Sequence, residues 1–454
     1  MRTLVRRAPP NSLLAAASRI HCRARSTLPS VPEPPLPSAV DANLDRTGAV
    51  SNLRDPFHSR KLQGKQGIFR GRDIVPMWIA DMDFRCPQPI VDATVACAQR
   101  GIFGYTNCPP ELTALTLERL ATVYGCATEP QSDWLHWMPG LVPGLSHAVR
   151  VAKARGVAIS GSVDAQTRIA VLTPAYPPFL GLPAYHHVSL DKVPLTVERD
   201  GSVGGLNFAL DWGALEASLS HPETRLLLLC NPHNPTGRCW PEHELRRLAA
   251  MCVEHEVLLC SDEVWGELPL EPERAPFTSA LALLEDVQGL RERLIILTSP
   301  SKCFNIATLD IALAVVPDSA LRAELIAEGR DMAEITPFGY FAAEAAFGHR
   351  ESEEWRTRVV AYLKANHEYA IARLSAVPGV HTTTPESSYL LWVDATEALP
   401  RVGATSAAAH LLEAGVGVSD AADFGAPPGC FRLNLACARH TLERGLARIV
   451  AALE

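Results

Sequence analysis

Five short apolar runs alternate with helical patterns through the middle of the sequence. They are RIAVLT at 168–173, RLLLLC at 225–230, VLLCS at 257–261, LIILTS at 294–299 and IALAVV at 311–316. Such runs are typical of strands buried on both faces of a largely parallel sheet. Because helical patterns such as PEHELRRLAAMCVEHE lie between several of them, the sequence predicts an α/β doubly wound domain. Ligands of such sheets bind beyond the carboxyl ends of the strands, so a site is expected just after these runs.

The length of the chain predicts a second domain, because 454 residues exceed what one hydrophobic core usually supports. We assign residues 96–325 to the large doubly wound domain. Residues 49–95 and 326–454 are expected to form a smaller α+β domain, in which a long helical pattern precedes SYLLWVD and CFRLNLAC. Residues 1–48 are expected to be a disordered leader and linker.

Charge is distributed unevenly along the chain. Residues 1–37 hold six arginines and one glutamate, which gives a charge of +5. Because the whole chain has a net charge of −8, the remaining residues carry −13. An acidic body without a basic stripe argues against nucleic acid as a partner. The sequence contains no run of eighteen uncharged apolar residues, so no membrane span is predicted. The twelve cysteines lack CxxC spacing, which predicts reduced thiols and no metal site.

The first thirty residues are rich in arginine, serine and alanine and contain no acidic residue. This composition is typical of a mitochondrial transit peptide, and we expect a mitochondrial protein. The alternatives are a disordered extension or a misplaced start codon, in which case a cytoplasmic location is expected. The proline-rich VPEPPLPS that follows cannot continue a helix and is interpreted as a linker.

Four polar stretches follow or flank the predicted strands. NPHNPTG contains Asn231 and Asn234, DEVW begins with Asp262, and Lys302 lies in TSPSKCFN. In PGLVPGLS, free backbone N–H groups at the start of a helix are suited to a phosphate. Each stretch alone is also explained as a turn, a helix cap, an ion pair or a surface lysine. Their combination in this order favours a shared site.

In this order the motifs PGLVPGLS, PAYPPF, NPHNPTG, SDEVW, SPSK and FRLNLA resemble those of fold-type-I enzymes that depend on pyridoxal phosphate (PLP). The stretches PMWIADMDF, GIFGYT and SYLLWVD are similar to the cystathionine β-lyase/C–S lyase branch of the class I/II aminotransferase superfamily. The resemblance extends over residues 50–454. It implies a three-layer, aspartate aminotransferase-like large domain with a mostly parallel sheet, plus a smaller α+β domain.

The resemblance implies roles for individual residues. Lys302 corresponds to the lysine that binds the PLP aldehyde and then carries the Cα proton, for which a desolvated amine is suited. Asp262 corresponds to the carboxylate that pairs with the pyridine nitrogen. Asn234 would hydrogen-bond the phenolic oxygen, and Tyr176 would stack on the ring. Arg432 would hold the α-carboxylate of an amino-acid substrate.

Further residues are implied to hold the phosphate. They are the backbone N–H groups of Leu141 and Val142, the hydroxyl of Ser299, and Tyr105. Because Tyr105 resembles a tyrosine that reaches the phosphate of the neighbouring subunit, a homodimer is expected.

Departures from aspartate-type aminotransferases favour the lyase branch. Asp310 stands where those enzymes usually carry a phosphate-binding arginine, and Trp265 stands in place of a tyrosine. Thr308 stands where the lyase branch commonly has glycine. The leading prediction is α,β-elimination from cystathionine or a cysteine S-conjugate to a thiol, pyruvate and ammonia. A class I/II aminotransferase is the alternative. Other PLP chemistry, or a fold kept for binding a macromolecule, is a third possibility.

Overall fold

The computed structural model describes residues 58–162, 166–199 and 204–454. The predicted leader and linker at 1–48, with the transit peptide inside it, lie outside the described residues. The same holds for the first residues of the predicted 49–95 segment.

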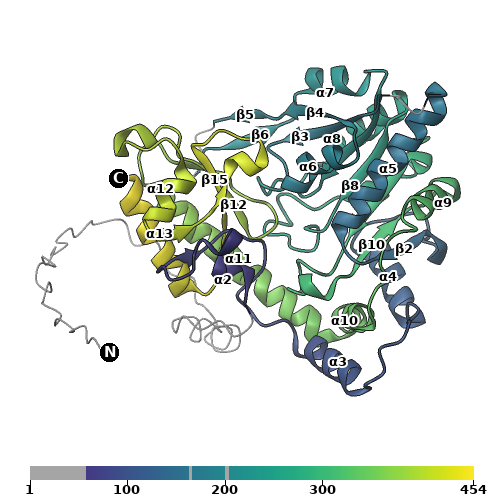
Figure 1. The fold of residues 1–454 in the computed structure, drawn as a ribbon, viewed down its shortest axis with the longest axis horizontal. Helices are drawn as coiled ribbons and strands as arrows, with labels where there is room; N and C mark the ends of the chain where they lie inside the picture. Colours follow the sequence, from purple (N-terminus) through teal and green to yellow (C-terminus); the bar gives the residue numbers. More distant parts are fainter. Residues whose placement is uncertain (1–57, 163–165, 200–203) are drawn as a thin grey trace, which may run out of the picture. The chain divides into compact units, whose positions relative to one another are not determined.

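One seven-stranded sheet forms the centre of the fold (Figure 1). Its strand order is β2-β10-β9-β8-β7-β3-β4. The strands are β2 (Leu135–Met138), β3 (Arg168–Thr173), β4 (Ser189–Pro194), β7 (Thr224–Cys230), β8 (Leu258–Asp262), β9 (Leu294–Thr298) and β10 (Ala312–Val315). All pairs from β4 to β9 are parallel, whereas β10 is antiparallel to both of its neighbours. The predicted mostly parallel sheet is confirmed, and each of the five predicted strands lies within about one residue of its run.

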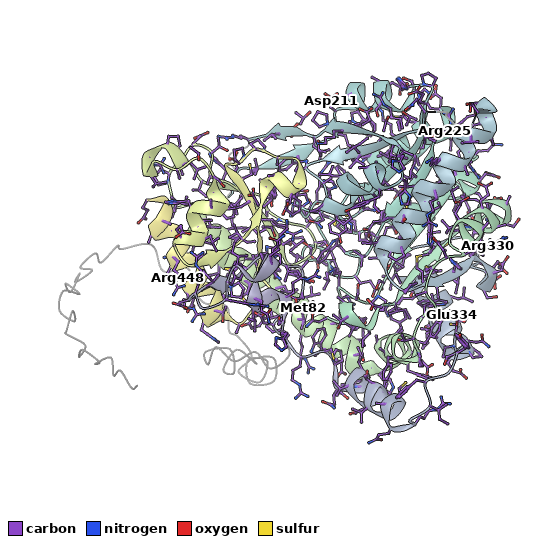
Figure 2. All side chains as sticks on the ribbon, in the orientation of Figure 1. Met82, Asp211, Arg225, Arg330, Glu334 and Arg448 are labelled. Carbon is purple, nitrogen blue, oxygen red and sulfur yellow. The ribbon has the colours of Figure 1, made fainter. Side chains whose placement is uncertain are left out.

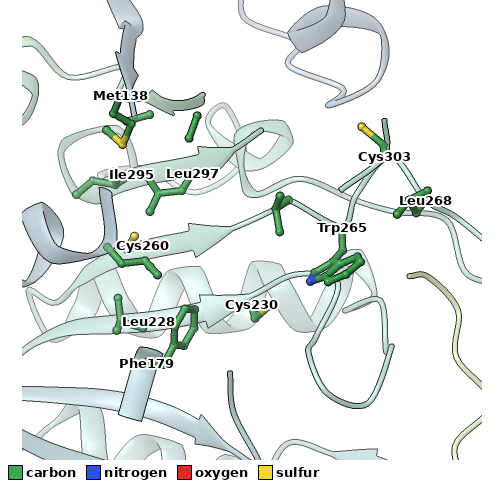
Figure 3. Close-up of a cluster of buried hydrophobic side chains, with 14 of the residues drawn as sticks. Met138, Phe179, Leu228, Cys230, Cys260, Trp265, Leu268, Ile295, Leu297 and Cys303 are labelled. Atoms are coloured by element: carbon green, nitrogen blue, oxygen red, sulfur yellow. The ribbon is translucent and has the colours of Figure 1, made fainter. Parts of the chain in front are cut away.

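Apolar side chains on both faces explain why the central strands are continuous hydrophobic runs. In β7, Leu226 and Leu228 belong to one core cluster, while Leu227 and Leu229 belong to another. The same alternation continues through β8 and β9, because neighbouring side chains of a strand point to opposite faces. Figure 3 shows part of the first cluster around Cys260 and Leu297. Both faces are therefore closed to water.

Helices cover the two faces of the sheet and complete three layers. Residues of α5 (Leu141–Ser160) and α6 (Pro177–Tyr185) pack in the first cluster. Residues of α7 (Trp212–Leu219) and α8 (Glu242–Glu254) pack in the second. The further helices are α3 (Gln88–Gln99), α4 (Pro110–Thr122), α9 (Ser319–Glu328) and α10 (Pro337–Gly348). The predicted three-layer arrangement is confirmed.

A second, smaller region is built from both ends of the described chain. Its antiparallel sheet has the order β11-β12-β15-β14, from β11 (His381–Thr382), β12 (Leu390–Asp394), β14 (Ser419–Asp420) and β15 (Cys430–Asn434). The early strand β1 (Val75–Pro76) pairs with β13 (Val416–Gly417). The remaining elements of this region are α2 (Arg60–Gln63), α12 (Ala407–Glu413) and α13 (Arg439–Leu453). A separate hairpin of β5 (Thr196–Glu198) with β6 (Asn207–Ala209) adds Phe208 to the second core cluster of the large sheet. The domain boundaries given above remain a prediction.

The long helix α11 (Arg350–Leu374) contributes to the cores of both regions. Trp355, Val359 and Leu363 belong to the first cluster of the large sheet. Ile371 and Leu374, nearer its end, belong to the core of the small region. The helix therefore connects the two hydrophobic cores.

No disulfide joins any two of the eleven cysteines in the described part. No group of His, Cys, Asp and Glu suited to a metal ion was found among the described residues. Within the same ranges, no helix combines the length and the apolar character that crossing a bilayer requires.

Candidate active site

Lys302 lies in the turn that follows β9, as the sequence predicts. Its side chain is partly exposed, and its Nζ donates a hydrogen bond to the carbonyl of Ala80 at 2.9 Å. The amine also lies 5.7 Å from the centre of the Trp265 ring. Burial lowers the pKa of Lys302 to about 8. The carboxylates of Asp81 and Asp262 have the opposite effect, because they favour the charged form of the amine. An amine with this pKa exchanges its proton readily near neutral pH.

Asp262 is the last residue of β8, in the middle of the sheet. It pairs with Cys230 on one neighbouring strand and with Leu297 on the other, and it is 2% exposed. Its Oδ1 accepts a hydrogen bond from the Val264 N–H at 3.2 Å. Burial raises the pKa of Asp262 to about 7, although this hydrogen bond and the charge of Lys302 both oppose the shift. Within the described ranges, no basic group lies at ion-pair distance from it.

Arg432 approaches the site from β15 of the small sheet. Phe431 and Leu433 point into the core of the small region, so Arg432 occupies the other face of the strand. Its Nη1 donates to Asn234 Oδ1 at 2.9 Å, and its Nη2 donates to the Trp78 carbonyl at 3.1 Å. Its Nε is buried and has no hydrogen-bond partner among the described residues. Burial lowers the pKa of Arg432 to about 10.

The side chains of Asn234 and Tyr176 complete the predicted central group. Asn234 is buried, and its amide oxygen is already used by Arg432, which leaves its amide N–H groups as donors. Tyr176 precedes α6 and contacts Phe179 edge to face at 6.0 Å between ring centres. Burial raises the pKa of Tyr176 to about 12, and Asp262 and Arg432 are among the charges that act on it. The structure therefore brings Lys302, Asp262, Arg432, Asn234 and Tyr176 together.

The predicted phosphate-binding groups lie at two chain segments. Leu141 and Val142 open α5, whose first N–H groups have no acceptor within the helix. Gly140 precedes them at a φ of +140°, which side-chain-bearing residues rarely adopt. The Ser299 hydroxyl donates to the Ile311 carbonyl at 2.6 Å, so it would have to exchange this partner to donate to a phosphate.

Tyr105 differs from the other predicted site residues because it is 94% exposed. It lies in the irregular segment between α3 and α4. Ile102 and Phe103 beside it are 70% and 63% exposed. Within one chain, Tyr105 therefore packs against almost nothing.

The family was then identified by comparison with known proteins. Residues 145–449 match the family model of aminotransferase class I and II. The cystathionine β-lyase PatB of Bacillus subtilis is 32% identical over 395 residues, which cover 85% of this chain and 94% of PatB. The chain belongs to the class I and II aminotransferase family.

Two solved structures are similar to this chain. OvoB is 33% identical, with a TM-score of 0.76 over 88% of this chain and 97% of its own. The PLP-bound C–S lyase of Staphylococcus hominis is 26% identical, with a TM-score of 0.76 over 88% and 96%. The similarity to PatB and to this C–S lyase places the chain on the C–S lyase branch that its motifs resemble.

The charges of the site fit PLP and an amino-acid substrate. A buried carboxylate, a desolvated amine and a buried guanidinium meet here, and Asp262 and Arg432 form no ion pair within the described residues. Isolated buried charges are costly, so each is expected to have a partner in the working enzyme. The Asp262 carboxylate is suited to a protonated ring nitrogen, and the Lys302 amine is suited to an aldehyde. The Arg432 guanidinium is suited to a substrate carboxylate.

The segment Trp78–Phe84, which carries the sequence WIADMDF, was not expected to form part of the site. Its backbone is held by side chains from both regions of the fold. The Ala80 carbonyl accepts from Lys302 and also from the Tyr389 hydroxyl at 3.0 Å. The Asn434 amide donates to the carbonyls of Ile79 at 2.5 Å and Asp81 at 2.6 Å.

The same segment is fixed to the large domain near Met82, which is labelled in Figure 2. The Asn305 side chain accepts from the Met82 N–H at 3.0 Å and donates to the carbonyls of Met82 and Phe84. The signature of the branch is therefore a strap, residues 78–84, that ties Lys302 to Arg432. One signal was available in the sequence, because Asn434 follows Arg432 by two positions and so shares its strand face.

The three residues that differ from the usual family pattern, Trp265, Thr308 and Asp310, differ in burial. Trp265 is 2% exposed and contacts Tyr389 edge to face at 4.9 Å, so it forms part of the wall beside Lys302. Asp310 and Thr308 are exposed, and Asp310 adopts a φ of +47°. Trp265 therefore affects the site directly, whereas the side chains of Asp310 and Thr308 face solvent.

Proposed function

We propose that the protein is a PLP-dependent C–S lyase that cleaves cystathionine or another cysteine S-conjugate. The products of this α,β-elimination are a thiol, pyruvate and ammonia. The observation that carries the proposal is that both the Asp262 carboxylate and the Arg432 guanidinium act electrostatically on the buried amine of Lys302. The choice of elimination over amino transfer is supported by the similarity to PatB along nearly its whole length.

Three side chains bind and orient the reactants. Arg432 is suited to hold the α-carboxylate through a pair of charge-assisted hydrogen bonds. Asn234 would donate its amide N–H to the phenolic oxygen of the cofactor. Asp262 would keep a proton on the ring nitrogen through its negative charge. When bound, PLP supplies an electron sink for the pair left at Cα.

Lys302 moves the proton. With a pKa of about 8, its amine takes the proton from Cα as the Cα–H bond breaks. The Cβ–S bond then breaks, and the sulfur leaves with the bonding pair as a thiolate. The proton on Lys302 is available to this thiolate, and the released three-carbon product hydrolyses to pyruvate and ammonia. No oxidant or reductant is consumed.

We further propose that the working unit is a homodimer in which Tyr105 reaches the phosphate of the neighbouring subunit. The exposed side chains of Ile102, Phe103 and Tyr105 support this proposal, because such an apolar group is expected to be covered by another surface. In each subunit the N–H groups of Leu141 and Val142 would bind the same phosphate. Ser299 would join them after releasing the Ile311 carbonyl.

An aminotransferase reaction at the same site is the second candidate, because the family as a whole carries that description. A panel of S-substituted cysteines tests both functions in one assay. The lyase releases pyruvate and thiol from its substrates without any added keto acid. Release that requires a keto acid, with no free thiol, would instead establish amino transfer. The member of the panel with the highest kcat/KM identifies the leaving thiol.

The composition of the first thirty residues also supports a mitochondrial location, which we propose on that ground alone. A fluorescent fusion of the full chain is expected in mitochondria, and a fusion lacking residues 1–48 in the cytoplasm. Cytoplasmic fluorescence from both fusions would contradict this.

A further inference from the structure

Lys61, Asp81 and Asp83 form a charged cluster at the strap. Lys61 lies in α2 and is only 4% exposed. Its Nζ lies 2.7 Å from Asp83 Oδ1 and 3.4 Å from Asp81 Oδ1, and it donates to the Asp81 carbonyl at 3.2 Å. Burial opposes the charge on Lys61, but Asp83 and Asp81 outweigh burial and raise its pKa. Lys61 is therefore an ammonium group shared by two carboxylates.

The two carboxylates differ in what else surrounds them. Asp83 takes the shorter contact with Lys61. Asp81 has a side chain that is 38% exposed, and its buried Oδ1 takes the longer, 3.4 Å contact with Lys61. Burial raises the pKa of Asp81, and Lys61 and Lys302 act in the opposite direction. Lys61 therefore pairs less closely with the carboxylate of Asp81 than with that of Asp83.

Asp81 also acts on the amine of Lys302, although within the described residues the two groups form no ion pair. Lys302 Nζ binds the carbonyl of Ala80, the residue directly before Asp81. Burial and the Arg432 guanidinium lower the pKa of Lys302, whereas the carboxylates of Asp81 and Asp262 raise it. Arg432 approaches from β15 and opposes the ammonium form, while Asp262 at the end of β8 favours it. The neutral phenol of Tyr389 faces the same carbonyl of Ala80.

We propose that Asp81 is a positioning residue for the proton transfer, whose carboxylate stabilises the ammonium that Lys302 becomes when it takes the Cα proton. Lys61 holds this carboxylate in place. The Nζ–H bond forms as the Cα–H bond breaks, and the proton stays on Lys302 until the leaving group takes it. The inference rests on the proposed role of Lys302 as the base and not on which thiol leaves.

The ionisation of Lys302 in the full-length apoprotein tests the inference without any turnover. Competitive acetylation across pH, followed by mass spectrometry of the peptide that carries residue 302, reports the pKa of that one amine. Asp81→Asn is expected to lower it by about one pKa unit, because a nearby opposite charge favours the ammonium form. The matched control Asp83→Asn removes the other carboxylate that pairs with Lys61. It is expected to lower the pKa of Lys302 by less than half as much.

Turnover of the PLP-loaded protein gives a second readout. Loss of one pKa unit of ammonium stabilisation corresponds to about a tenfold fall in kcat, with KM for the amino acid almost unchanged. Asp83→Asn is expected to stay within about twofold of wild type. An unshifted amine in Asp81→Asn, or an equal shift in both variants, would overturn the inference. Absence of lyase activity in the wild type would count against the proposed function alone, since the apoprotein titration does not depend on it.

Discussion

Replacing Asp262 by asparagine is expected to stabilise the apoprotein while it abolishes function. The carboxylate is buried in the central strand with one backbone hydrogen bond and no ion pair within the described part of the chain. Asparagine has nearly the same shape, and its amide oxygen can accept the same bond from Val264. The buried carboxylate, whose negative charge destabilises the apoprotein, is thereby exchanged for a neutral amide.

The size of this effect follows from the pKa. Burial raises the pKa of Asp262 from 3.8 to about 7, and three pKa units correspond to about 4 kcal/mol. The folded state binds this proton more tightly than the unfolded state does. The penalty is therefore absent below about pH 4, grows as the pH rises, and is complete above about pH 7. The stability advantage of Asp262→Asn should grow by roughly 2–3 kcal/mol between pH 5 and pH 8.

Urea unfolding of the two apoproteins at pH 5 and pH 8 measures this difference. Asp310→Asn is a suitable control, because Asp310 is exposed and asparagine tolerates its left-handed backbone. The control is expected to match wild type at both pH values. An Asp262→Asn apoprotein that is less stable than wild type at pH 8, or whose advantage is the same at both pH values, would refute the reasoning.

Three further predictions concern the reacting groups. Lys302→Ala should lose turnover, and borohydride should no longer fix the cofactor to the peptide that carries residue 302; covalent fixation in this variant would show that another residue binds PLP. Arg432→Ala should lower kcat/KM by roughly ten- to a hundredfold, since one hydrogen bond to a charged group contributes about 1.5–3 kcal/mol; an unchanged kcat/KM would assign the carboxylate to another residue. Mixing inactive Tyr105→Ala and Lys302→Ala proteins under subunit exchange should restore about a quarter of wild-type activity, because half of the dimers then contain one intact site. If mass measurements show mixed dimers but no activity returns, Tyr105 serves its own subunit.

The sequence was sufficient to predict five strands of the large sheet and the edge at which the candidate site lies. The runs that form β7, β8 and β9 are apolar throughout because both faces are covered, so each can be recognised without its neighbours. Asp262 and the turn with Lys302 follow adjacent parallel strands, and such strands have their carboxyl ends at one edge. That these two residues lie at the same edge of the sheet is therefore a consequence of the topology. The antiparallel direction of β10 was not predicted, because an apolar run has no sign of direction.

The strap could not be predicted, because its contacts join residues that are far apart in the chain. Lys302 and Ala80 are separated by 222 positions, and Arg432 and Trp78 by 354. These bonds also use backbone carbonyls, which every residue has, so no side-chain pattern marks them. Lys61 lies in a four-residue helix without a motif, and its two aspartates identify it only in the folded protein.

The central claim is that Lys302, Asp262 and Arg432 carry out a C–S elimination. The most direct test measures thiol and pyruvate released from L-cystathionine by the purified, PLP-loaded protein in the absence of any keto acid, with Lys302→Ala as the blank. The account predicts equal amounts of thiol and pyruvate over many turnovers, and neither product from the variant. Products that form only after a keto acid is added, or that form equally well with Lys302→Ala, would contradict it.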